Sequence, residues 1–317
     1  MAILAFGRGA LGLGLAVFLL SGCGGSQTGL NAGNKTTMLS AQPPQAGATK
    51  AFTSQDLLYV GGICGGVCIF AYPSGKYVAS ISVPQSGFMC TDTGGDVFVT
   101  VPQSESVGYI YEYAHGGTQP IQTLSDSGFP YGCSVDPTTG NLAVANYFAP
   151  GSKYGHGNVA IYANAQGTPT YYKDPNIYWY QLCSYDGSGN LLVNGNAEES
   201  FTPYAVLPKG SSTFTDITFD ESVGFGPIQW DGQHFAIGTG YEGSDTISQV
   251  SISGSKGTVV SQTQIIGPIK HVNIPFWIQA NKVILLFRPD GRRASWLGYW
   301  KYPSGGKPLN VLKRVGG

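Results

Sequence analysis

The stretch that decides the fold is residues 182–193, which read LCSYDGSGNLLV: a short apolar strand, a tight polar turn and a second apolar strand. The same order recurs at residues 89–99 (MCTDTGGDVFV) and 132–144 (GCSVDPTTGNLAV). Less regular copies occupy residues 229–237 and 278–285. Aspartate, asparagine and glycine supply the backbone conformations, including positive φ, that tight hairpins need. These copies indicate a chain built from repeated β-hairpins.

The spacing of the copies predicts the number of repeats. Successive copies lie 40 to 49 residues apart, measured between the residues that open the second strands: Asp56, Asp96, Asn141, Asn190, Gln233 and Lys282. A second hairpin pattern, with a Gly/Pro turn, alternates with the first, for example at residues 68–76 and 109–117. Four strands in each of six repeats predict an all-β, six-bladed β-propeller over residues 51–317. A two-sheet sandwich, which also has many short strands, is the competing fold.

Composition excludes several classes of protein. Charged residues make up 11% of the chain, about half the usual share of ~25%, which argues against a coiled coil or a long-helix bundle. The net charge of −1 gives no support for a nucleic-acid partner. Residues 51–250 contain 4 Lys/Arg and 17 Asp/Glu, whereas residues 251–317 contain 10 and 1. Either the basic last blade meets the acidic first blade, or the basic residues bind an anion or anionic lipid headgroups.

The N-terminus has the pattern of a bacterial lipoprotein signal. Arg8 precedes an 11-residue apolar run, Ala10 to Leu20, which is too short to span a bilayer. Ser21, Gly22 and Cys23 then complete a lipobox. We expect a signal peptide at residues 1–22, lipid (palmitate among the acyl chains) on Cys23 and a disordered tether through residue 50. An ordinary signal peptide with a chance cysteine is the alternative.

This signal predicts a place in the cell. The lipid would hold the exported protein on a membrane of the bacterial cell envelope. Gly24 follows the lipidated cysteine, which resembles the sorting pattern for the outer membrane in a bacterium with two membranes.

The turn D-x-x-G-N-L-x-V, seen at residues 186–193, resembles that of NHL, YVTN-repeat and gluconolactonase-like six-bladed propellers. Members of the last group hold a divalent cation in the central channel with Glu, Asn and Asp. The resemblance therefore implies a weak metal site, for Ca²⁺, to which Asn146 and Asn194 would contribute. A metal-dependent lactonase or other hydrolase, with its site in the channel, is the activity that would follow.

Blade topology assigns each loop to a face. With strands A to D numbered outward, the A–B and C–D turns share one face, called the turn face here. The B–C and D–A loops share the other, the loop face. The turns look like simple connections, whereas the loops are longer and less alike, and variable loops on a rigid scaffold commonly carry function.

Ligand-binding candidates are all expected on the loop face: Trp179, Tyr147, His156, Asn194, Asn196, Arg288, Arg292 and Arg293. Trp179 and Tyr147 suit stacking on a sugar or another flat ligand. The arginines suit a carboxylate or phosphate. Packing between blades is the competing interpretation for the aromatic residues.

Five cysteines remain beyond Cys23. Cys64 and Cys68 are predicted to close a small disulfide loop in the first blade. Cys90, Cys133 and Cys183 are expected at the same site of three consecutive inner strands, as small apolar packing residues; a metal cluster is the alternative. The odd count leaves a thiol free.

The sequence thus favours a lipid-anchored module that binds or scaffolds an envelope protein or a glycan through its loop face. The first alternative is the metal-dependent lactonase, and the second is a carbohydrate-binding surface lipoprotein. No G-x-S-x-G, H-E-x-x-H or Walker motif is present.

Overall fold

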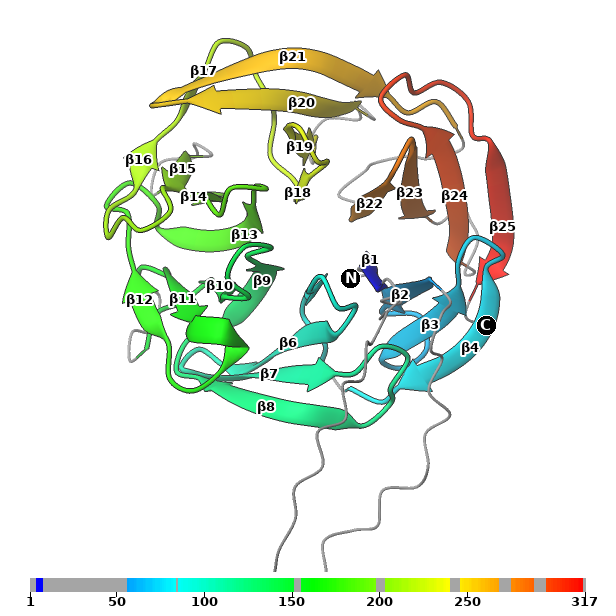
Figure 1. Cartoon of the computed structure of the whole chain (residues 1–317), viewed down its shortest axis with the longest axis horizontal. Helices are drawn as coiled ribbons and strands as arrows, with labels where there is room; N and C mark the ends of the chain where they lie inside the picture. The colour runs from blue at the N-terminus through cyan, green and yellow to red at the C-terminus, as the bar shows by residue number, and fades with distance from the viewer. Residues whose placement is uncertain are drawn as a thin grey trace, which may run out of the picture.

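The computed structural model describes residues 4–7, 56–83, 85–150, 155–197, 203–239, 246–267, 275–287 and 295–315. Within these ranges the chain forms six small sheets arranged in a ring around an open centre (Figure 1). The predicted six-bladed β-propeller is confirmed. Apart from a single 3-10 turn, η1 (Ala163–Ala165), the described elements are strands. No helix in the described ranges is long and apolar enough to cross a membrane.

The blades follow one another along the chain. Blade 1 contains β1 (Leu4–Gly7), β2 (Leu57–Gly61), β3 (Val67–Ala71) and β4 (Lys76–Ile81). Blade 2 contains β5 (Met89–Thr91), β6 (Val97–Ser104), β7 (Val107–Tyr113) and β8 (Pro120–Asp126). Blade 3 contains β9 (Pro130–Val135), β10 (Leu142–Asn146), β11 (Asn158–Tyr162) and β12 (Thr170–Tyr172).

Blade 4 contains β13 (Trp179–Tyr185), β14 (Leu191–Asn196), β15 (Tyr204–Leu207) and β16 (Thr215–Asp216). Blade 5 contains β18 (Ile228–Trp230), β19 (Phe235–Gly238), β20 (Thr246–Ser253) and β21 (Lys256–Gln264), and β17 (Thr218–Phe219) joins its outer edge in parallel. Blade 6 contains β22 (Phe276–Gln279), β23 (Lys282–Phe287), β24 (Ser295–Lys301) and β25 (Asn310–Val315).

The ring closes at the inner edge of blade 1. Its innermost strand, β1, pairs antiparallel with β2 from Leu4 opposite Val60 to Gly7 opposite Leu57. Blade 6 is built wholly from the C-terminal part of the chain. β1 lies within the residues that the sequence assigns to a signal peptide, so cleavage before Cys23 would remove this strand from the anchored protein and leave the inner edge of β2 without it. The boundaries of that peptide and of the tether stay predictions.

The apolar core lies between blades. All five residues of β2, β3 and β10 are buried, whereas β4 and β8, on the outside, are mostly exposed or half-buried. One apolar cluster, for example, joins Val159 of blade 3 to Tyr180 and Val193 of blade 4. The second strand of a blade is covered on both faces by the neighbouring blades, so it needs a continuous run of apolar residues. This explains why short apolar runs mark the repeats in the sequence.

Aspartates hold the A–B turns. Asp186 Oδ1 accepts hydrogen bonds from the backbone N–H of Ser188 (2.8 Å) and Asn190 (2.9 Å). Asp136 and Asp231 form equivalent bonds in blades 3 and 5. Such side-chain bonds to the following backbone favour a tight turn. The turn aspartates of blades 2 to 5 are therefore folding signals.

Candidate functional site

Aromatic side chains of blades 2 to 4 meet on the loop face. The cluster, called the aromatic platform here, consists of Phe88, Phe129, Tyr131, Tyr147, Phe148, Tyr178 and Trp179. Tyr147 and Trp179 stack with ring centroids 5.8 Å apart and planes at 8°. All members except the buried Phe88 are half-buried. They therefore offer a continuous apolar surface that solvent still reaches.

Four segments of the chain build this platform: Phe88, residues 129–131, residues 147–148 and residues 178–179. Tyr147 donates its backbone N–H to Phe129 O (2.9 Å), and Phe129 donates its own to Phe148 O (3.0 Å). The backbone N–H of Tyr178 donates to Asn196 O (2.8 Å). The next residue, Trp179 on β13, lies opposite Asn196 on β14. Since backbone hydrogen bonds fix these loops, the rings are held in place before any ligand arrives, which lowers the entropic cost of binding.

A buried polar network supports the platform from below. Asp126 accepts hydrogen bonds from Gly128 N (2.8 Å), Asn146 Nδ2 (3.0 Å) and Tyr162 OH (3.0 Å). Asn146 Nδ2 also donates to Asn158 Oδ1 (2.9 Å). Burial raises the pKa of Asp126, and the three hydrogen bonds partly offset that rise. The network ties the end of β8 to the ends of β10 and β11, from which the platform loops leave.

Of the predicted ligand residues, the structure brings Trp179, Tyr147 and His156 to one surface. His156 is exposed and lies at the edge of the platform, where the centroids of its ring and the Tyr178 ring are 3.6 Å apart. Asn196 Oδ1 accepts a hydrogen bond from Gln181 Nε2 (2.7 Å). Phe129 and Phe148 were not among the sequence candidates, because nothing in a linear repeat shows that these two loops pair.

The two asparagines suggested for a metal site have other surroundings. Asn146 and Asn194 are fully buried. Asn194 Oδ1 accepts from Leu182 N (3.2 Å) and its Nδ2 donates to Gly226 O (3.0 Å), so it links blade 4 to blade 5. Neither side chain lines the central channel. Across the described residues, no three His, Cys, Asp or Glu side chains are grouped to hold a metal ion.

Cys23 and the arginines Arg288, Arg292 and Arg293 lie outside the described residues, so their predicted roles stay predictions.

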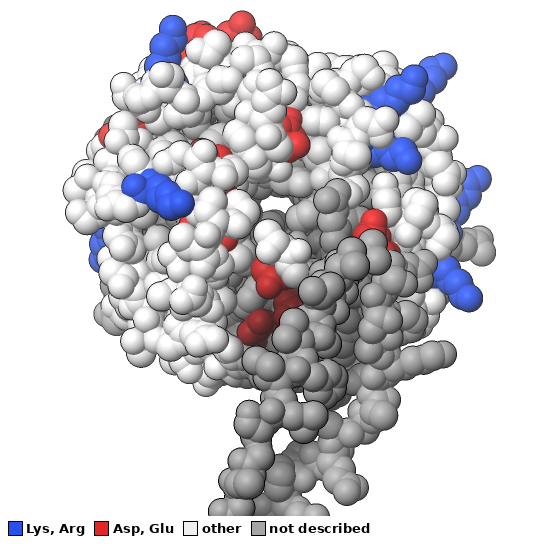
Figure 2. Space-filling model, viewed as in Figure 1, with Lys and Arg blue, Asp and Glu red and all other residues white. Residues whose placement is uncertain are grey.

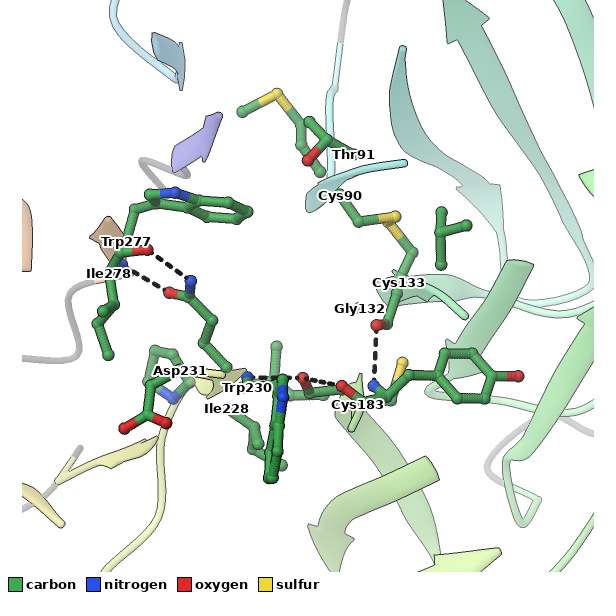
Figure 3. A pocket seen from close by; sticks show the side chains of 18 of the residues that line it. Cys90, Thr91, Gly132, Cys133, Cys183, Ile228, Trp230, Asp231, Trp277 and Ile278 are labelled. Atoms are coloured by element: carbon green, nitrogen blue, oxygen red, sulfur yellow. Dashed lines mark hydrogen bonds between the residues drawn. A yellow bond between two sulfur atoms is a disulfide. The ribbon is translucent and has the colours of Figure 1, made fainter. Parts of the chain in front are cut away.

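The central channel forms a cavity of about 590 Å³ along the inner strands β5, β9, β13, β18 and β22 (Figure 3). It reaches the A–B turns, since Thr93, Pro137 and Gly232 line it. The turn face is therefore more than a set of connections, contrary to the sequence-based expectation.

Side chains link the inner strands around this channel. Ser134 Oγ accepts from Tyr185 N (3.0 Å) of the next blade, and Ser184 Oγ accepts from Trp230 N (3.1 Å). Gln229 makes two such bonds to Ile278: its Oε1 accepts from Ile278 N (2.7 Å) and its Nε2 donates to Ile278 O (3.0 Å) (Figure 3). Each of these residues lies two positions before the turn residue of its own blade.

In blade 2 the equivalent position, two residues before the turn aspartate Asp92, is occupied by Cys90. Cys90 and Cys133 form a disulfide, with 5.6 Å between their Cα atoms. The expectation of one shared site holds for Cys133 and Cys183, which lie opposite Val144 and Val193 at equivalent positions. It is wrong for Cys90, which lies opposite Phe98, one register position away. Cys64 and Cys68 form a second disulfide. Cys183 is free and buried, and burial raises the pKa of its thiol to about 12, so it stays protonated and unreactive near neutral pH.

Basic and acidic side chains are distributed differently. On the face shown in Figure 2, several acidic side chains lie around the central opening and the basic side chains lie away from it. Exposed lysines stand on outer strands and outer turns: Lys76, Lys173, Lys209, Lys256, Lys301, Lys307 and Lys313. Acidic side chains also lie toward the outside, for example the exposed Asp216 on β16 and the exposed Asp220 and Glu221, so the described basic side chains are peripheral and the acidic ones are found in both places.

Comparisons with known proteins place the fold but no family. No family model matches the sequence, and none of the curated proteins does. Among solved structures, the chain is similar to a protein in the crystal structure of the mitotic checkpoint complex, at 15% identity over 77% of this chain and 73% of that one, with a TM-score of 0.52. It is also similar to the β-propeller domain of Cps50 (Swd1) from Myceliophteria thermophila, at 10% identity over 81% and 83%, with a TM-score of 0.51.

A third similar structure is hydrazine synthase from Kuenenia stuttgartiensis, at 13% identity over 73% of each chain, with a TM-score of 0.50. At such low identities these similarities show the propeller fold alone.

Proposed function

We propose that this protein is a binding module of the bacterial cell envelope, anchored through lipid on Cys23, that captures a partner protein on its aromatic platform. The observation that carries the proposal is the platform itself: half-buried rings from three loop segments, fixed by backbone hydrogen bonds. Tyrosine and tryptophan dominate binding hot spots, because each buries a large area at a low cost in conformational entropy.

The fold and the charge pattern support a protein partner. Propellers commonly serve as protein-binding scaffolds, and one structure with this fold was solved in the mitotic checkpoint complex. The platform residues themselves carry no charge, so the complementary surface would be apolar and aromatic at its centre.

Cross-linking in the cell tests this proposal. A photo-reactive amino acid at His156, at the edge of the platform, should give one adduct of discrete mass that Trp179→Ala abolishes. The same group at Tyr77, an exposed tyrosine on β4, serves as the control and should give none. Equal adducts at both positions, or an adduct unaffected by Trp179→Ala, would rule out the platform as the docking site.

Carbohydrate binding is the second candidate, favoured by the nearly parallel rings of Tyr147 and Trp179. Soluble peptidoglycan fragments are the probe. If a glycan is the partner, they should quench tryptophan fluorescence in the unmodified protein and do so far less in Tyr147→Ala. Quenching of equal size in both proteins would contradict it.

The lipid anchor needs its own test. Cells fed labelled palmitate should label the unmodified protein and leave Cys23→Ser unlabelled and released from the membrane fraction. Membrane retention of Cys23→Ser would contradict the anchor and leave the platform hypothesis standing.

A further inference from the structure

The central channel has properties of a second binding site, which shares only the buried Phe88 with the aromatic platform. Its volume of about 590 Å³ lies within the range of ~300–1,000 Å³ typical of small-molecule sites. Its lining runs from Thr93, Pro137 and Gly232 at the turn face to Pro227, Pro275 and the buried platform residue Phe88 at the other end. A ligand held near the turn face leaves the half-buried rings of the platform free for a partner.

The channel wall combines aromatic surface with negative charge. Tyr185, Trp230, Phe276 and Trp277 line it, and the rings of Trp230 and Trp277 border the opening in Figure 3. Among the described lining residues the charged side chains are Asp92 and Asp231, and no Lys, Arg or His is present. Among the described lysines, Lys209 reaches the turn of blade 3, where its Nζ donates to Thr138 Oγ1 (2.8 Å), whereas the charge that acts on Asp92 is that of Asp96.

The two carboxylates differ in how far the protein satisfies them. Asp231 accepts hydrogen bonds from Gln233 N, His234 N, Gln249 Nε2 (2.7 Å) and Tyr302 OH (2.6 Å). Asp92 instead accepts from backbone N–H groups of its own turn, those of Asp96 (2.8 Å to Oδ1), Gly95 and Gly94. Burial raises the pKa of Asp92, and hydrogen bonds from its own turn only partly counter that rise. The negative charge of Asp96 raises the pKa of Asp92 further, and the charges of Asp96 and Asp92 raise the pKa of Glu112 beyond the rise that burial causes. A cation beside Asp92 would compensate this excess.

We infer that the channel binds an organic cation: an ammonium or guanidinium group on a partly apolar stem, which enters at the turn face and pairs with Asp92. Low-dielectric walls focus the field of like charges and concentrate counter-ions. Tryptophan and tyrosine faces attract cations, and their rings accept an apolar stem. An arginine or lysine side chain of a peptide and a free polyamine share this chemistry.

Calorimetric titration of the purified protein tests the inference with matched probes. Acetyl-arginine amide should bind at least tenfold more tightly than acetyl-citrulline amide, which has nearly the same shape and no charge, and its affinity should fall as salt is raised. Spermidine distinguishes the source: tighter binding of spermidine indicates a free polyamine, and tighter binding of the arginine probe indicates a side chain. Equal binding of the arginine and citrulline probes, or no binding of any cation at millimolar concentration, would overturn the inference.

Two pairs of variants locate the site. Asp92→Asn should weaken binding of the cation at least tenfold, whereas Asp186→Asn, at the same turn position of blade 4 but outside the channel lining, should leave it unchanged. Thr93→Lys, exposed at the channel mouth, should weaken binding without touching a folding contact. Ser188→Lys, exposed in the turn of blade 4, is its control. Equal losses within either pair would assign the effect to overall charge and overturn the site.

Discussion

The two faces of the propeller are held in different ways. On the turn face, an aspartate such as Asp186 bonds residues two and four positions ahead of it. On the loop face, Asp126 bonds Asn146 and Tyr162, which lie 20 and 36 residues away. The comparison teaches that the face with the clearest sequence signal is organised locally, whereas the face with the aromatic platform depends on contacts that only folding creates.

The largest expected difference in the free energy of unfolding comes from replacing a glycine with alanine on each face: Gly157 on the loop face and Gly167 on the turn face. A Cβ at Gly157 would overlap the backbone oxygen of Asn146 beneath the platform, whereas Gly167, with φ +70°, has open space around it. Gly157→Ala should therefore cost about 3 kcal/mol of unfolding free energy or prevent folding, and Gly167→Ala about 1 kcal/mol. Urea unfolding measures both. Similar losses would show that the loop face is not the more constrained of the two.

Aspartate replacement gives the next largest difference. Asp126→Ala would leave buried donors without their acceptor, including Gly128 N, and should cost about 3 kcal/mol. Asp186→Ala frees N–H groups of an exposed turn that water can reach, and should cost about 1 kcal/mol. Thermal unfolding of the two variants at one pH compares them. A larger loss for Asp186→Ala would invert the comparison.

The smallest effect is the pH dependence of stability. Burial raises the pKa of Asp136, but hydrogen bonds from Thr139 and Thr138 outweigh it, and the pKa ends below its ordinary value. Asp136 thus stabilises the fold above its unfolded pKa of about 3.9, and this contribution is lost as pH falls through the folded pKa. The pKa of Asp126 is raised, so its effect has the opposite sign: stability rises as pH falls through its folded pKa toward the unfolded value.

Asp136→Asn should therefore flatten the plot of unfolding free energy against pH below the ordinary aspartate pKa, and Asp126→Asn should flatten it at pH values above that pKa. Each slope is bounded by about 1.4 kcal/mol per pH unit for one group. Urea midpoints between pH 3 and 7 measure them. Profiles that keep the unmodified slopes would show that neither carboxyl is perturbed as the structure indicates.

The candidate site was only partly predictable from sequence. Tyr147, Trp179 and His156 were identifiable, because aromatic residues in long loops of a rigid scaffold suggest binding. The sequence suggested the channel only as a metal site with Asn146 and Asn194, and Asp92 was missed, since it belongs to a turn motif that also has a sufficient folding role. The Cys90–Cys133 disulfide was missed because the inner strand of blade 2 meets its turn one residue earlier than that of blade 3.

The sequence by itself determined the number of blades, the hairpin order and the local turns. These depend on the period of apolar runs and on side chains that bond backbone a few residues ahead, so the information is local. Only the tertiary structure decided which loops pair to form the platform and which aspartate-containing turns line the channel. Those features require segments tens of residues apart to pack together, and the register of such packing is set by the whole ring.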